Sequence, residues 1–85
     1  MAHFNVRVEV WLKSDLVDAE GKMVEEALKD LGYLVNSVRV GKVYTFKLES
    51  ESLELAKRTV VSICGRLLAN PVKDIYSFNV IEDEA

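Results

Sequence analysis

The stretch Val38-Arg39-Val40-Gly41-Lys42-Val43-Tyr44-Thr45-Phe46-Lys47-Leu48-Glu49 decides the fold of this 85-residue chain. It is rich in β-branched and aromatic residues, as strands are, yet it has Gly41-Lys42 in its middle. If this pair is a two-residue hairpin loop, the chain folds back there into two short strands. If the strand continues, the even-numbered residues from Val38 to Leu48 stay on one face without a break in phase. The unbroken phase favours one long strand with a bend or bulge at Gly41.

Such a strand is too long for the protein that contains it. From Asn36 to Glu49 it would span roughly 45 Å at about 3.3 Å per residue. A chain of this size has a radius of gyration of about 12 to 13 Å when compact. One end should therefore project with its apolar side chains, either Tyr44, Phe46 and Leu48 or Val38 and Val40. Projecting apolar strand needs a partner, so we expect an assembly surface and a sheet extended by oligomerisation.

A strand with one buried face opens the chain. Apolar residues at the even positions from Phe4 to Leu12 alternate with mostly polar ones. Trp11 departs from this pattern, because its indole lies on the polar face. Two interpretations are open. Residues of the same chain cover the indole, or it is a partner contact, since tryptophan is enriched at interfaces.

Two amphipathic helices are predicted. The first follows a loop over 14–20 with Asp18 as N-cap, and Gly32 ends it as a residue able to take positive φ. The second is capped by Ser50 or Ser52 and ends at Asn70-Pro71, where proline cannot continue a helix. Both helices have apolar stripes at 3.6-residue spacing, which are Met23, Val24, Ala27, Leu28 and Leu31 in the first and Leu53, Ala56, Val60, Ile63, Cys64 and Leu67 in the second.

The last segment completes the fold class. It predicts a strand with Tyr76, Phe78 and Val80 on one face, followed by a frayed acidic tail over 82–84. The order strand, helix, strand, helix, strand predicts an α+β two-layer sandwich with a long bent central strand, as one domain over residues 1–85. If the long strand breaks at Gly41, the order becomes βαββαβ and the fold ferredoxin-like.

Composition excludes several classes of function. Hydrophobic residues make up 49% and charged residues 29%, which is typical of a globular protein. A net charge of −3 argues against a nucleic-acid surface. A single cysteine excludes an intrachain disulfide. No signal-peptide pattern and no apolar run approaching 18 residues is present, so we expect a cytoplasmic protein.

Little catalytic chemistry is available. His3 is the only histidine and lies at the start of a strand, and Cys64 lies in an apolar stripe, where a buried hydrophobe is favoured over a nucleophile. Helix capping explains Asp18 and its acidic neighbours better than a metal site does. Gly41-Lys42 lacks the flanking glycines of a phosphate-binding loop. The sequence predicts no catalytic, cofactor-binding or metal-binding residues, and hence a binding or assembly module.

Three blocks carry a resemblance to a known family. Leu31-Gly32-Tyr33, Val38-Arg39-Val40-Gly41-Lys42 and Leu67-Leu68-Ala69-Asn70-Pro71-Val72, in this order and spacing, resemble the PurS small subunit of phosphoribosylformylglycinamidine synthase. The resemblance covers nearly the whole chain. Family members often have proline where Ala19 stands, and the first position of a helix accepts either residue.

The resemblance implies a role in purine biosynthesis. The partners would be a large synthetase subunit, which uses ATP and Mg, and a glutaminase subunit. Together they convert formylglycinamide ribonucleotide to the amidine with ammonia from glutamine. The small subunit would be a non-catalytic assembly component that forms dimers or tetramers and binds no cofactor itself.

The residues expected at assembly contacts are Trp11, Arg39, Gly41, Lys42, Tyr44, Asn70 and Pro71. Several of them also have a purely structural explanation. Gly41 would only shape the strand, and Asn70-Pro71 would only end the helix. Two other classes of function remain as alternatives. One is a small-molecule regulatory module of the ACT type. The other is an RNA-binding sheet, which is disfavoured because Tyr44 and Phe46 are in phase with the core.

Overall fold

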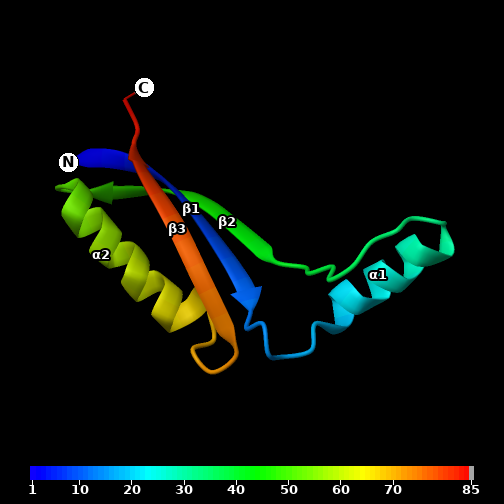
Figure 1. Ribbon diagram of the computed structural model, residues 1–85. Helices are drawn as coiled ribbons and strands as arrows, with labels where there is room; N and C mark the ends of the chain where they lie inside the picture. Colours follow the sequence, from blue (N-terminus) through cyan, green and yellow to red (C-terminus); the bar gives the residue numbers. More distant parts are fainter. Residues whose placement is uncertain (85) are drawn as a thin grey trace.

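The computed structural model describes residues 1–84 as a three-stranded antiparallel sheet with one helix packed on it and a second helix held away from it (Figure 1). The elements in chain order are β1 (Ala2–Leu12), α1 (Ala19–Asp30), β2 (Lys42–Ser50), α2 (Leu53–Ile63), a π-helical turn (Cys64–Leu68) and β3 (Asp74–Glu82). β1 is the central strand, and the order across the sheet is β2-β1-β3. The expected α+β class and element order are confirmed.

The core lies between the sheet and α2. Phe4, Val6, Val8 and Val10 alternate along β1 and are all buried, as their two-residue period requires. The register places Val8 between Tyr44 of β2 and Phe78 of β3. α2 contributes Ala56 and Val60, and the π-helical turn that follows contributes Cys64; these three residues are fully buried and lie one helical turn apart. One face of the sheet is therefore packed, and the other faces solvent.

The structure fixes the start of α2 and shows that the helix ends differently from the prediction. Ser52, not Ser50, is the N-cap, and its Oγ accepts a hydrogen bond from the Leu55 N–H at 3.1 Å. The helix gives way to the π-helical turn, in which the Ala69 N–H donates to the Cys64 carbonyl at 2.9 Å. The extra residue in this turn rotates Leu67 off the predicted stripe. Leu67 is exposed, and Leu68 packs against the core in its place.

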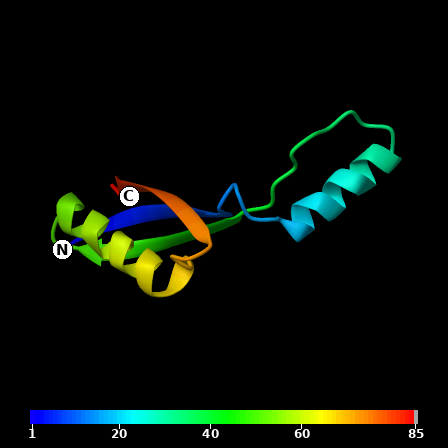
Figure 2. The same cartoon turned by 60° about the horizontal axis from the view of Figure 1, so that its bottom comes forward.

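Helix α1 has the predicted ends but not the predicted place. Asp18 caps it, and Gly32 follows it with φ of 95°. The Tyr33 N–H closes the end by donating to the Leu28 carbonyl at 3.0 Å. Both views show α1 beyond the end of the sheet rather than on its face (Figures 1 and 2). The predicted two-layer sandwich would place both helices on the sheet of their own chain, and this placement is wrong for α1.

The reason lies at Gly41. The segment over residues 31–41 runs from the end of α1 to the start of β2 and does not form a hairpin at Gly41. No turn therefore brings α1 alongside the sheet (Figure 1). Regular strand begins only at Lys42, and the preceding residues 34–41 have no strand partner within residues 1–84. The chain thus continues through Gly41 without reversing, as predicted, but only the part from Lys42 onward pairs with another strand of the sheet. The projecting end is the one with Val38 and Val40.

The projection makes the molecule long and thin. Its radius of gyration is 16.6 Å and its extents are 52 × 31 × 14 Å. A compact chain of this length would have a radius of gyration of about 12 Å. We call residues 19–41, which comprise α1 and the return segment to β2, the arm.

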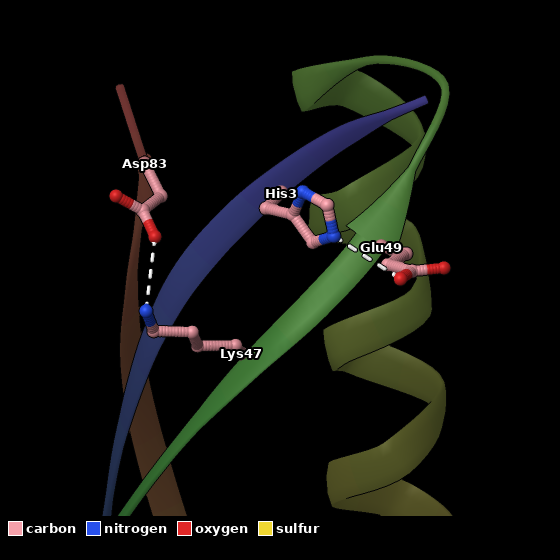
Figure 3. A network of polar contacts seen from close by, with 4 residues as sticks. All are labelled: His3, Lys47, Glu49 and Asp83. Atoms are coloured by element: carbon pink, nitrogen blue, oxygen red, sulfur yellow. Dashed lines mark hydrogen bonds and ion pairs between the residues drawn. The ribbon is translucent and has the colours of Figure 1, made fainter. Parts of the chain in front are cut away.

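The opposite end of the sheet is closed by polar contacts (Figure 3). His3 lies opposite Glu49 across β1 and β2, with 3.1 Å between Nε2 and Oε1. Lys47 Nζ lies 3.1 Å from Asp83 Oδ2, and the Asp83 N–H donates to the His3 carbonyl at 2.8 Å. The acidic tail is therefore ordered through Asp83, against the expectation of fraying. The first described residues of β1 and the last described residues after β3 lie at this end of the sheet, away from the arm (Figure 1).

Candidate functional site

The arm meets the sheet at a cluster of polar and glycine contacts, which we call the joint: Trp11, Asp18, Gly21, Glu25, Arg39 and Gly41. Asp18 is its centre. Its Oδ1 accepts a hydrogen bond from the Gly21 N–H at 2.9 Å, and its Oδ2 accepts one from the Val40 N–H at 2.8 Å. One carboxylate thus caps α1 and holds the return segment beside it.

Glu25 makes a similar contact with the return segment about two helical turns after Asp18. Its Oε1 accepts a hydrogen bond from the Val38 N–H at 3.0 Å, and its Oε2 lies 3.0 Å from Lys29 Nζ. Gly21 lies on the same side of α1, since residues four apart are neighbours on a helix. A Cβ at Gly21 would lie well inside van der Waals contact of the Val38 carbonyl oxygen. The return segment therefore runs in direct backbone contact with the first turns of α1.

Arg39 ties the return segment to the end of β1. Its Nη2 donates to the carbonyls of Leu12 at 2.9 Å and Lys13 at 3.2 Å, and its Nη1 donates to the Leu16 carbonyl at 3.3 Å. A planar guanidinium suits this arrangement because its donors diverge in a fixed fork. Arg39 therefore fixes the loop that leads from β1 to α1.

Trp11 and Gly41 contact each other on the face of the sheet that α2 does not cover. A Cβ at Gly41 would lie 2.7 to 2.8 Å from atoms of the Trp11 ring, so main chain lies directly against the indole. The Trp11 Nε1–H donates to Glu9 Oε1 at 3.3 Å. Of the two interpretations of Trp11, the structure shows cover from its own chain. The cover is partial, and the side chain stays half-buried.

The remaining predicted residues lie outside the joint. Lys42 is exposed at the first position of β2, and Tyr44 is half-buried against the core. Asn70 organises the turn before β3: its Oδ1 accepts from the Val72 N–H at 2.9 Å, and its N–H donates to Asp74 Oδ2 at 2.8 Å. Pro71 is exposed in this turn. An assembly role for these residues stays a prediction.

Sequence reasoning did not predict the contacts of Gly21, Glu25 and Asp18 with the return segment. It assigned Asp18 only as a helix cap and paired Glu25 only with Lys29, a pair that the structure confirms. A glycine in the first turn of a helix was the available signal, because glycine lowers helix propensity and needs a packing reason there.

The arm carries a bare apolar surface. The stripe predicted for α1 has Met23 71% and Leu31 74% exposed, and Leu34 beyond the helix is fully exposed. Val24 and Tyr33 add to it. The joint therefore holds in place a helix whose apolar face is largely left uncovered by residues 1–84.

The joint lowers the pKa of both of its carboxyl groups, Asp18 and Glu25. Hydrogen bonds from the Val40 and Gly21 N–H groups, with the nearby charge of Arg39, hold the pKa of Asp18 below its usual value. The Val38 N–H and then Lys29 lower the pKa of Glu25 in the same way. Both groups are bound in their charged forms.

The lowered pKa values predict a joint that weakens in acid. A carboxyl whose pKa is depressed by folding adds stability above its unfolded pKa, about 3.9 for Asp and 4.3 for Glu, and loses it as the pH falls through the lower folded value. We expect the melting temperature to fall below about pH 4. Melting curves of wild type and Asp18→Asn from pH 7 to acid test this, because the variant should lose part of the pH dependence. An identical dependence in both proteins would contradict it.

Other titratable groups offer little chemistry. Burial raises the pKa of the Cys64 thiol, in agreement with its place in the core. Within residues 1–84, no three His, Cys, Asp or Glu side chains are grouped so as to hold a metal ion. In the same part of the chain, no helix has the length and apolarity to cross a membrane.

The fold and the joint define a small α+β protein whose helical arm is tied to the end of the sheet by hydrogen bonds. Residues 5–82 match the family model PurS, described as phosphoribosylformylglycinamidine (FGAM) synthase. The chain belongs to the PurS family. The FGAM synthase subunit PurS of Methanothermobacter thermautotrophicus is 38% identical over 81 residues, covering 95% of this chain and 96% of that protein. The Bacillus subtilis subunit is 35% identical over 80 residues, covering 93% and 94%.

Solved structures agree with this assignment. PurS of Methanocaldococcus jannaschii, described as one of the subunits of formylglycinamide ribonucleotide amidotransferase, matches with a TM-score of 0.85 at 32% identity, over 95% of this chain and 99% of that one. A chain in the structure of PurLQS from Thermotoga maritima matches with a TM-score of 0.88 at 30% identity, over 95% and 100%. The resemblance of the three sequence blocks is confirmed.

Proposed function

We propose that this chain is a non-catalytic assembly subunit of FGAM synthase. It brings the glutaminase and synthetase subunits together for the glutamine-dependent, ATP-driven conversion of formylglycinamide ribonucleotide to the amidine. Membership of the PurS family over residues 5–82 supports this role. The match to a chain of the Thermotoga maritima PurLQS structure supports assembly with two larger subunits. ATP and Mg would be used by the synthetase subunit.

The proposal rests on the exposed apolar surface of the arm. Its apolar stripe is exposed, while its base is fixed to the sheet by Asp18, Glu25 and Arg39. A flexible tail would lose conformational entropy on binding, whereas a fixed arm is already ordered. A rigid apolar projection is therefore suited to protein contacts, including those of a homo-oligomer.

Reconstitution tests the proposed function. The chain is mixed with its cognate synthetase and glutaminase, with glutamine and ADP present, and examined by size exclusion with light scattering. We expect one peak containing all three proteins, and glutamine-dependent amidine formation that requires this chain. Activity that is independent of the chain, together with separate elution, would overturn the proposal and favour a ligand-binding role.

A further inference from the structure

The connection between α2 and β3 exposes apolar side chains in a place where the helix pattern predicts core. Leu67 should continue the buried stripe of Val60 and Cys64, but the π-helical turn leaves it 81% exposed. Val72 is 80% exposed five residues later, and Pro71 beside it is exposed as well. π-helical turns are rare and occur frequently at functional sites. The exposure of Leu67 therefore calls for a functional explanation.

We call the exposed residues of this connection the corner: Arg66, Leu67, Pro71, Val72 and Lys73. The corner lies beside the start of β3, at the end of the sheet where the arm departs (Figure 1). The Lys13 N–H, just beyond β1, donates to the Lys73 carbonyl at 2.8 Å and ties the corner to the sheet. Both views show α1 extending away from this connection (Figures 1 and 2). The corner is therefore separate from the apolar surface of the arm.

Hydrogen bonds around Asn70 fix the shape of the corner. The Asn70 Oδ1 accepts from the Val72 N–H at 2.9 Å, and the Asn70 carbonyl accepts from the Asp74 N–H at 2.7 Å. The Asn70 N–H donates in turn to Asp74 Oδ2 at 2.8 Å. Ala69 is buried and Leu68 packs against the core, so the chain before Asn70 is held from below. A surface that is already ordered loses little conformational entropy on binding.

The charges of the corner are both positive. Arg66 and Lys73 are exposed on either side of its apolar residues, and among the described residues neither forms a salt bridge. Asp74, the carboxylate next to them, accepts the Asn70 N–H. The opposite end of the sheet instead carries the carboxylates Glu49, Glu82 and Asp83. In a chain with a net charge of −3, the corner is thus a cationic spot that favours a partner with carboxylates.

The chemistry of the corner fits a protein partner better than a membrane or a nucleic acid. Apolar residues in the centre with charged residues around them are the usual anatomy of a protein interface. Membrane-binding basic segments have about 4 to 8 Lys or Arg residues, and nucleic-acid surfaces need comparable clusters. The corner has two such residues.

We propose that the corner docks into an apolar hollow, rimmed by carboxylates, on the large synthetase subunit. Leu67 and Val72 fill the hollow, and Arg66 and Lys73 pair with its rim. The inference rests on the proposed function and names the surface by which this chain holds the synthetase. A large chain divides into several domains, and apolar hollows occur preferentially between domains, which favours the synthetase over the glutaminase. The arm stays free for contacts between copies of this chain.

Removal of the apolar side chains tests the docking. The chain is titrated into synthetase and glutaminase with glutamine and ADP present, and complex formation is followed by fluorescence anisotropy. For Leu67→Ser with Val72→Ser we expect the half-saturating concentration to rise at least tenfold, because two large apolar contacts are lost. Both positions are exposed, so the melting temperature and the self-association of the chain should change little. The matched control Leu53→Ser with Ile81→Ser, also at exposed positions, should bind normally.

Salt dependence tests the charged rim. Pairs between exposed charges are screened by salt, so binding of the wild-type chain should weaken as the ionic strength rises. Arg66→Gln with Lys73→Gln should bind more weakly at low salt and lose most of this dependence. Lys57→Gln with Arg58→Gln changes the net charge equally on the exposed side of α2 and should keep it.

Cross-linking identifies the occupant of the corner without relying on affinity. A benzophenone attached to the cysteine of Leu67→Cys should, on irradiation in the three-protein mixture, give a product with the mass of this chain plus the synthetase. Cys64 is buried and does not compete for the label. The same label on Glu54→Cys, exposed at the start of α2, should give no such product.

The outcomes separate this inference from the proposed function. Cross-links from position 67 to the glutaminase or only to a second copy of this chain would overturn the docking. Equal binding by wild type and Leu67→Ser with Val72→Ser would do the same. In each of these cases the wild-type chain still joins the complex, and the assembly role stands. If the wild-type chain does not join the complex at all, both fail.

Discussion

Alanine at Gly21 is expected to push the arm out of its joint. The new Cβ would overlap the Val38 carbonyl oxygen and lie 2.8 Å from Asp18 Oδ2, and the backbone atom cannot rotate away as a side chain would. Overpacking of this kind costs about 1 to 3 kcal/mol. The gain in helix propensity offsets about 1 kcal/mol of it. We expect a net loss of unfolding free energy in urea, and dimerisation weakened at least tenfold in light scattering.

Gly65 provides the matched control. It also lies in a helical segment, but a Cβ there meets nothing within 4 Å. Gly65→Ala should therefore leave dimerisation unchanged and alter stability by at most about 1 kcal/mol, in the stabilising direction. If the two alanine variants behaved alike, helix propensity and not the contact with Val38 would govern Gly21.

Alanine at Asp18 should release the return segment from α1 by removing a hydrogen-bond acceptor. The substitution removes the N-cap of α1 and leaves the Val40 N–H without its acceptor. Loss of an N-cap alone typically lowers the melting temperature of so small a protein by about 5 °C. We expect at least that decrease, together with hydrogen exchange at the Val40 and Gly21 amides more than tenfold faster than in wild type.

Two further substitutions separate the roles of the Asp18 carboxylate. Asp15→Ala removes an exposed carboxylate from the same loop and should change neither quantity. Asp18→Asn keeps one acceptor oxygen and should give an intermediate result. Unchanged exchange at Val40 in Asp18→Ala would show that Arg39 and Glu25 hold the return segment without Asp18.

The sequence predicted what depends on local pattern. The alternation in β1 and β3, the cap at Asp18, a serine cap at position 50 or 52 and the positive φ at Gly32 follow from neighbouring residues. The even-residue phase through Gly41 also correctly indicated that the chain would not turn back. These features need only a few residues to be specified, and the fold class follows from their order.

What the sequence could not predict depends on where the arm lies. An apolar stripe on α1 shows that the helix needs cover, but it carries no information on which chain supplies it. Gly21 and Glu25 became recognisable only once the return segment was seen to run along α1. The π-helical turn that exposes Leu67 depends on how α2 ends against the sheet, which a 3.6-residue pattern does not contain.

His3 and Asp83, near the two ends of the described chain, lie side by side at the end of the sheet opposite the arm, where Asp83 pairs with Lys47 (Figure 3). Purification tags, fluorophores or fused proteins at either terminus would therefore point away from the joint and from α1. A short linker between the two ends would also allow circular permutation, because neighbouring termini need little chain to connect them. New ends could then be opened within residues 34–37 of the return segment. That would cut the covalent link between α1 and β2 while leaving the contacts of Asp18, Glu25 and Arg39 in place.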